Sequence, residues 1–259
     1  GVIDMNSIPK VIHYCWFGGN PLPKEYVKYI ESWKKYLPDY EIKRWDENNF
    51  DFSTCDYARE AYEAKKWAFV SDYVRLKVVY DNGGLYFDTD VEVIKPIDEI
   101  VEKGAFMGLE MQKMKKGSKD DIHVEVNTGL GFGAPAGMEI YKDFLEKYES
   151  MHFLNADGSY NQITTVKHIT EVFKKYGFDG TDTLQTVGEI TLYPSEYFDP
   201  IDCATGEERY TDKTVTIHHY SASWMDNKGK LKIKIKKLLG HRVTGMIISI
   251  KRLLGKSGD

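Results

Sequence analysis

Cysteine and long apolar runs are both scarce in this chain of 259 residues. It contains three cysteines, an odd number at wide spacing, so neither a disulfide framework nor a zinc knuckle is expected. No uninterrupted apolar run approaches the roughly 18 residues that a membrane-spanning helix needs. The first residues have neither the charged nor the apolar segment of a signal peptide, so we expect a cytoplasmic protein. A hydrophobic content of 42% excludes a wholly disordered chain.

Positive charge is concentrated in one segment, although the net charge is only −5. Residues 228–259 hold eight Lys and two Arg against one acid, whereas residues 1–227 hold 25 basic and 39 acidic residues. An acidic main body argues against binding to nucleic acid. We predict one domain over 1–227 and a basic amphipathic tail over 228–259. The tail could dock on an anionic membrane surface, at the inner face of the cell membrane, or it could pack on the domain or keep it soluble.

Strand-like and helical patterns alternate over the first 100 residues, which predicts an α/β fold with a mostly parallel central sheet flanked by helices. The expected strands cover residues 10–17, 41–45 and 85–94, with others near 104–109, 124–134, 190–193 and 214–219. The expected helices cover about 26–37, 55–66, 67–82, 139–150 and 161–175. Asn82-Gly83-Gly84 is a strong signal for the end of a helix.

Two carboxylates, Asp88 and Asp90, interrupt the apolar run over 85–94. In a continuous strand they would point to the same face, because side chains alternate with a period of two. Paired oxygen ligands at the C-terminal end of a strand suit a hard divalent cation that also contacts phosphates. Two solvated turn acids are the alternative, but charges inside an apolar strand need a partner.

Other polar and aromatic residues allow a structural and a functional interpretation. Asp72 and Arg75 are three apart on a predicted helix and share a face, either as a simple ion pair or as contacts for a polyhydroxyl ligand. Trp16 precedes Gly18-Gly19 and could be a core residue or a platform for a nucleobase. His218 and His219 are neighbours on a predicted strand, so at most one can join a given site. A neutral imidazole is a reasonable third ligand beside carboxylates, although a lone histidine is usually structural.

Three segments in this order resemble glycosyltransferase family 32: IPKVIHYCWFGG, SDYVRLKVVYDNGGLYFDTDVEV and HHYSASW. The family includes initiating mannosyltransferases and bacterial capsule and lipopolysaccharide sugar transferases, and the catalytic domains of clostridial glucosylating toxins are distantly similar. The resemblance implies a GT-A type nucleotide-sugar-binding fold and a nucleotide-sugar donor. It also implies a divalent metal, usually Mn²⁺ with Mg²⁺ as the alternative, and retention of the anomeric configuration.

The resemblance also implies roles for individual residues. Trp16 would stack on the base, and Asp72 and Arg75 would contact the donor sugar during catalysis. Asp88 would reach the ribose and the metal, and Asp90 would bind the metal directly.

The match is looser in the second half of the chain. There the resemblance favours His219 over His218 as the third metal ligand. Ser223 and Trp224 would approach the diphosphate, and Asn127 would line the catalytic pocket.

Together these features predict a retaining, metal-dependent glycosyltransferase of surface polysaccharide synthesis. Its donor would be a UDP-sugar, with GDP-mannose as the alternative, and its acceptor a glycan or a lipid-linked saccharide. A phosphohydrolase of the haloacid-dehalogenase type also uses Asp-x-Asp, but it expects Thr or Val at the position of Glu92. A nucleotide- or glycan-binding protein without turnover is the third hypothesis.

Overall fold

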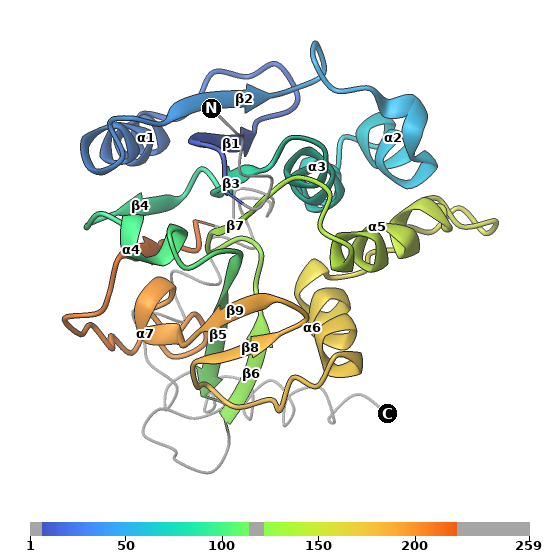
Figure 1. Cartoon of the computed structure of the whole chain (residues 1–259). Helices are drawn as coiled ribbons and strands as arrows, with labels where there is room; N and C mark the ends of the chain where they lie inside the picture. Colours follow the sequence, from blue (N-terminus) through green and yellow to red (C-terminus); the bar gives the residue numbers. More distant parts are fainter. Residues whose placement is uncertain (1–6, 114–121, 222–259) are drawn as a thin grey trace, which may run out of the picture.

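The structure is a computed structural model that describes residues 7–113 and 122–221 (Figure 1). The predicted tail over 228–259, Ser223 and Trp224 therefore lie outside the described residues. Within the described part of the chain, no helix combines the length and the apolar character that crossing a bilayer requires.

A mixed sheet of eight strands forms the centre of the molecule, and the predicted α/β class is confirmed. Its strands are β1 (Val11–Cys15), β2 (Glu41–Trp45), β3 (Gly84–Tyr86), β5 (Phe106–Lys113), β6 (Ile122–Val126), β7 (Phe132–Ala134), β8 (Gln185–Val187) and β9 (Ile190–Tyr193). The main path runs β2-β1-β3-β7-β5-β9-β8, with β6 paired to β5. Strands β2, β1, β3, β5 and β9 run in one direction, and β6, β7 and β8 run in the other.

A second, two-stranded sheet joins β4 (Val91–Val93) to β10 (Thr216–His218). The helices are α1 (Lys24–Tyr36), α2 (Asp56–Glu63), α3 (Trp67–Asn82), α4 (Asp98–Val101), α5 (Ile140–Glu149), α6 (Thr165–Lys175) and α7 (Ser195–Phe198), with a 3₁₀ turn at Phe52–Thr54. Figure 1 shows α1, α4 and α7 on one side of the main sheet and α2, α3, α5 and α6 on the other.

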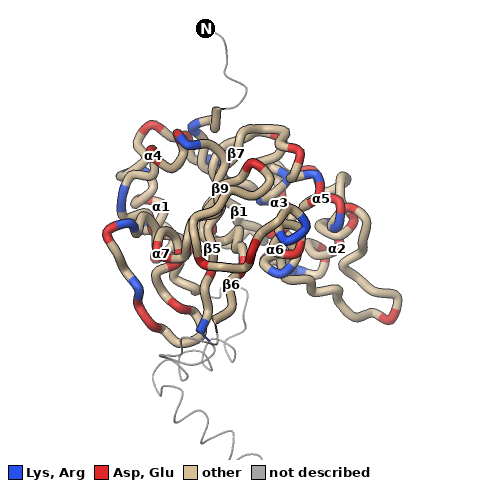
Figure 2. Tube along the Cα trace, turned by 60° about the horizontal axis from the view of Figure 1, so that its bottom comes forward, with Lys and Arg blue, Asp and Glu red and all other residues tan. Residues whose placement is uncertain are grey.

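Each side of the sheet buries its own hydrophobic cluster. On the side of α2, α3, α5 and α6, large aromatic residues such as Tyr73 and Phe144 are fully buried. On the side of α1, α4 and α7, Trp33 and Phe198 are equally buried. Burial of each large aromatic side chain contributes roughly 1.5 to 3 kcal/mol. Along the described chain in Figure 2, Lys and Arg positions are interspersed with Asp and Glu positions.

Helix α3 ends at the predicted Gly83-Gly84 pair, and both glycines have positive φ angles of 66° and 109°. A Cβ on Gly83 would lie 2.8 Å from the ring of Pro9, and one on Gly84 would lie 2.7 Å from the carbonyl oxygen of Val11. The absence of side chains therefore lets the chain leave α3 and enter β3 directly beside β1.

The single strand predicted over 85–94 is wrong. Strand β3 stops at Tyr86 and β4 starts at Val91, in different sheets, and a hydrogen bond of 3.0 Å from the Val91 amide to the Asp88 carbonyl closes a turn between them. The side chains of Asp88 and Asp90 therefore lie close together because of this turn, and not because side chains alternate along a strand.

Candidate metal and nucleotide-sugar site

Asp88, Asp90 and His218 form a cluster whose ligand atoms lie within 4.8 Å of one another. The turn between β3 and β4 carries the two carboxylates. The antiparallel pairing of β10 with β4, with His218 opposite Val91, brings the imidazole back to that turn. Helix α1 anchors the same region, because the Trp33 indole donates to the Val91 carbonyl over 2.8 Å.

Asp90 accepts hydrogen bonds from two residues of the C-terminal segment. Its Oδ1 lies 3.2 Å from His218 Nε2, and its Oδ2 accepts from the Ser221 amide at 3.0 Å and the Ser221 hydroxyl at 2.9 Å. Burial alone would raise the pKa of Asp90, but His218 and Ser221 hold that pKa well below its usual range. Burial likewise opposes the charge on His218, yet the adjacent Asp90 carboxylate raises the pKa of His218 to about 9.

The His219 side chain lies outside this cluster, so the geometry favours His218 as the third ligand, whereas the sequence favoured His219. Its Nε2 contacts Glu92 Oε2 at 2.9 Å, and its ring stacks on Tyr29 with centroids 4.4 Å apart. Neighbouring residues at the end of β10 point in different directions, so only His218 can face Asp90.

Arg75 connects α3 to the carboxylate turn. Its two terminal nitrogens contact Asp88 at 3.2 and 3.3 Å, and one of them also contacts Asp72 at 3.1 Å. The guanidinium lies 5.1 Å from the centroid of the Tyr86 ring, whose hydroxyl donates to Asp88 over 3.0 Å. Only 6% of the Arg75 side chain is exposed, so these are buried, charge-assisted contacts.

The two carboxyl groups around Arg75 resist ionisation because they are buried. Burial raises the pKa of Asp72 to about 7, although Arg75 opposes this shift. Burial also raises the pKa of Asp88, again against the effect of Arg75. One guanidinium thus faces two carboxyl groups. Together with Asp90, three ionised carboxylates beside one arginine would carry two excess negative charges, which a divalent cation would balance.

Asn127 lies near Asp88, because Gly129 in the same loop is adjacent to both side chains. Its side-chain oxygen accepts from the Gly129 amide at 2.7 Å, and its amide nitrogen donates to Glu110 over 2.6 Å. A Cβ on Gly129 would lie 2.6 Å from Asp88 Oδ2, so this loop approaches the carboxylate as closely as a glycine permits. Glu110, at β5, is a polar partner that the sequence did not reveal.

Trp16 is half-buried at the end of β1, and its indole donates to the Asn20 carbonyl over 2.7 Å. Its ring meets the edge of Tyr26 with centroids 5.7 Å apart. The Tyr26 hydroxyl lies 2.7 Å from the Ser221 hydroxyl, and Ser221 contacts Asp90, so two residues connect Trp16 to the carboxylate cluster. Sequence reasoning missed Tyr26, whose helical spacing resembles that of a core residue, and Ser221, which lies in the HHYSASW segment without a distinguishing pattern.

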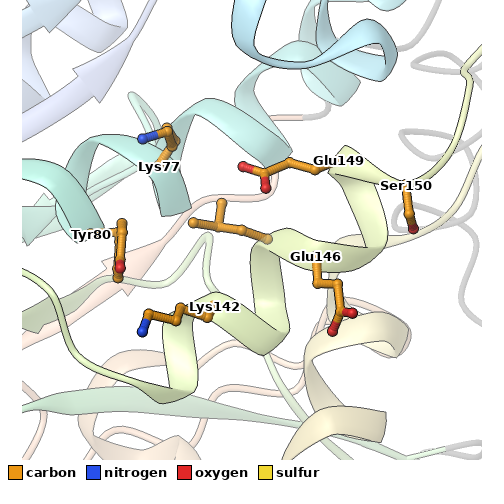
Figure 3. A pocket seen from close by; sticks show the side chains of 7 residues that line it. Lys77, Tyr80, Lys142, Glu146, Glu149 and Ser150 are labelled. Atoms are coloured by element: carbon orange, nitrogen blue, oxygen red, sulfur yellow. The ribbon is translucent and has the colours of Figure 1, made fainter.

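A hollow of about 600 Å³ lies elsewhere, between α3 and α5 (Figure 3). Its lining includes Lys77, Tyr80, Lys142 and Glu149, and none of the predicted site residues lines it. Lys77 pairs with Asp81 and Lys142 with Glu139, so both lysines are already neutralised.

The site is therefore a carboxylate and imidazole cluster suited to a divalent cation, flanked by a buried arginine and a half-buried tryptophan. Residues 23–107 match the family described as a glycosyltransferase sugar-binding region containing a DXD motif. The resemblance to DXD glycosyltransferases of family 32 is confirmed for this segment, which contains Asp72, Arg75, Asp88 and Asp90.

Two fungal mannosyltransferases are similar to part of this chain. Inositol phosphoceramide mannosyltransferase 3 of Schizosaccharomyces pombe is 30% identical over 105 residues, which are 39% of this chain and 29% of that protein. The initiation-specific alpha-1,6-mannosyltransferase of Candida albicans is 30% identical over 106 residues, 37% of this chain and 28% of that protein. The chain thus spans under a third of the length of these relatives.

Solved glycosyltransferase structures are also similar. PaToxG glycosyltransferase superposes with a TM-score of 0.44 at 17% identity, covering 65% of this chain and 69% of that one. The galactosyltransferase LgtC superposes with a TM-score of 0.43 at 14% identity, covering 89% of this chain and 96% of that one.

Proposed function

We propose that this chain is a metal-dependent glycosyltransferase that moves a sugar from a nucleotide-sugar to a glycan or a lipid-linked saccharide. The observation that carries the proposal is the convergence of Asp88, Asp90 and His218 beside the buried Arg75. Arg75 and the two aspartates lie in the segment that matches a glycosyltransferase sugar-binding region. The partial match to mannosyltransferases supports the same class of reaction.

The donor set fits a divalent cation. Two carboxylates and one imidazole are oxygen and nitrogen ligands of the kind that Mn²⁺ accepts, with Mg²⁺ as the alternative. Asp88, Asp90 and His218 would hold the ion, and His218 must lose a proton to do so. A bound cation would supply Lewis-acid neutralisation of the charge that develops on the leaving diphosphate.

The surrounding residues would bind and orient the donor. Trp16 offers an aromatic face for the base, and Asp88 can accept a hydrogen bond from a ribose hydroxyl. Asp72 and Arg75 present a carboxyl and a guanidinium to the sugar, whose contacts favour the reaction when they strengthen in the transition state. Asn127 would line the pocket beside Gly129, with its amide held in one orientation by Glu110.

The finer assignments follow from the family resemblance. We propose a UDP-sugar donor, with GDP-mannose as the competing donor, and transfer with retention of configuration. The proposed setting is surface polysaccharide synthesis in the cytoplasm at the inner face of the membrane. Deletion of residues 228–259 should release the protein from anionic vesicles, and unchanged binding would contradict the proposed role of the tail.

The test of the reaction class is nucleoside diphosphate release from a panel of UDP-, GDP- and dTDP-sugars, with Mn²⁺ and with EDTA. We expect slow release from one donor, abolished by EDTA and by Asp90→Asn. Phosphate release from simple esters would favour a phosphohydrolase instead. Nucleotide binding without release, with and without glycan acceptors, would favour a binding protein.

A further inference from the structure

Asp199, directly after α7, is a buried carboxyl group with one atom left unpaired. Its residue is 1% exposed, and its backbone amide caps α7 by donating to the Ser195 carbonyl. Its Oδ1 accepts a hydrogen bond of 2.8 Å from the Tyr220 hydroxyl. Its Oδ2 has no hydrogen-bond partner among the described residues. A buried polar atom without a partner is costly, so this atom requires an explanation.

His218 presents the complementary unpaired atom. Its Nε2 faces Asp90, whereas its buried Nδ1 has no hydrogen-bond partner within the described chain. Tyr220 contacts both residues, because its hydroxyl binds Asp199 while its ring meets the edge of the His218 ring with centroids 4.2 Å apart. A ring nitrogen and a carboxyl oxygen that both lack partners therefore belong to two residues that contact the same tyrosine.

The backbone of Tyr220 is in an unfavourable conformation for a non-glycine residue. Its φ angle is +47°, in the left-handed region that is unfavourable for a bulky residue. This turn lets His218 and Ser221 both reach Asp90, although only two residues separate them. The hydrogen bond to Asp199 and the ring contact with His218 both involve this residue.

Asp199 and His218 also interact electrostatically. Burial and then Glu110 raise the pKa of Asp199, whereas His218 and Arg209 act to lower it. Asp199 in turn favours the charged form of His218. A histidine that binds a metal through one ring nitrogen generally donates its other N–H to a carboxylate or a carbonyl, which fixes the tautomer and the orientation of the ring.

We propose that Asp199 is a positioning residue for His218, accepting its Nδ1–H directly or through one buried water so that Nε2 is presented to a divalent cation. This rests on the proposed metal site. Asp199 would touch neither the cation nor the substrate, and its effect would pass entirely through the imidazole.

The test measures Mn²⁺ binding to the EDTA-stripped full chain by the electron paramagnetic resonance signal of free Mn²⁺. Asp199→Asn keeps the shape and an acceptor for Tyr220 but offers an NH₂ group to Nδ1, which favours the wrong tautomer. We expect Mn²⁺ to bind about tenfold or more weakly. In a His218→Ala background the same substitution should cause no further loss, because its only route to the metal is gone.

Asp202→Asn is the matched control. Asp202 is a fully buried carboxylate three residues further on, and it accepts from the Lys113, Ala204 and Thr205 amides. We expect this variant to unfold at lower denaturant in EDTA while Mn²⁺ affinity of the folded protein stays within twofold. Asp199→Asn should show the opposite pattern, with weaker Mn²⁺ binding and no loss of stability.

Tyr220→Phe is the second variant, in case Asp199→Asn does not fold. It keeps the carboxylate but removes the hydrogen bond that orients it, so a severalfold loss of Mn²⁺ affinity is expected. The proposal would be overturned if a folded Asp199→Asn protein bound Mn²⁺ with wild-type affinity. If Asp199→Asn does not fold, wild-type Mn²⁺ affinity in Tyr220→Phe would overturn it instead. So would an equal loss in Asp202→Asn. If the wild type binds Mn²⁺ no better than Asp90→Asn does, the proposed metal site itself is wrong.

Discussion

Arg75 contacts both carboxylate oxygens of Asp88 through its two terminal nitrogens, Nη2 to Oδ1 at 3.2 Å and Nη1 to Oδ2 at 3.3 Å. This contact joins α3 to the turn after β3, and the Arg75 side chain in it is almost fully buried. A buried pair of this kind adds little net stability when it forms, but loss of one partner leaves an uncompensated charge.

Arg75→Ala should therefore lower the free energy of unfolding by about 3 kcal/mol or more in EDTA, and Arg75→Lys should not restore a two-pronged contact. Arg59 is the matched control, because it pairs with Asp56 and Glu63 on an exposed helix surface. Arg59→Ala should cost at most about 1 kcal/mol. Denaturant unfolding of the three variants measures this, and equal losses at the two positions would contradict the buried role of Arg75.

The two neighbouring histidines should differ in their effect on metal binding. His218→Ala removes a member of the carboxylate cluster, so Mn²⁺ affinity should fall at least about tenfold. His219→Ala removes a residue that contacts Glu92 and Tyr29 instead, so its Mn²⁺ affinity should stay close to that of the wild type. Calorimetric titration with Mn²⁺ separates the two, and the reverse ranking would restore the assignment made from the sequence.

Asp72 should reduce stability at alkaline pH. Burial raises its folded-state pKa to about 7 from an ordinary 3.8, so the folded protein binds this proton more tightly than the unfolded chain does. Its ionisation therefore costs stability above pH 7, and this cost disappears as the pH falls from about 7 to about 4.

Asp72→Asn should accordingly be more stable than the wild type by roughly 2 kcal/mol at pH 8, while its advantage shrinks at pH 5. Unfolding in urea at both values, in EDTA, measures the difference. A variant that is less stable than the wild type at pH 8 would show that the contact with Arg75 outweighs the cost of burial. Donor turnover should fall in the same variant, which is the common trade-off at functional sites.

Trp16 should contribute to nucleotide affinity without contributing to metal affinity. Stacking of a base on an aromatic side chain is worth about 1 to 3 kcal/mol, so Trp16→Ala should weaken nucleoside diphosphate binding about ten- to a hundredfold. Trp16→Phe keeps an aromatic face and should recover part of the loss. Titration with UDP and GDP gives both values, and Mn²⁺ affinity serves as the internal control. Unchanged nucleotide affinity in Trp16→Ala would indicate that Trp16 contributes only to packing.

Most of the fold could be predicted because its signals are local. The helix from Trp67 to Asn82 ends at the glycine pair where the sequence predicted an end, and β9 occupies the four predicted positions 190–193. The prediction of one strand over 85–94 was wrong because a run of apolar residues indicates that the segment is buried, but not that it forms one continuous strand. The two halves of that run are buried in different sheets, and the hydrogen bond from Val91 to Asp88 that separates them is not visible as a pattern.

The sequence by itself determined which residue types were available for chemistry and how α3 and the carboxylate turn follow one another. Asp72, Arg75, Asp88 and Asp90 lie within twenty residues, so local geometry was enough to group them. Only the tertiary structure shows that the side chain of His218, and not that of His219, faces Asp90. It alone also brings Ser221 to Asp90, Tyr26 to Ser221, and Asp199 to Tyr220. The reason is physical, because β10 pairs with β4 although it follows more than a hundred residues later in the chain. The register of this pairing selects the imidazole that faces Asp90, and that register depends on contacts across the whole fold.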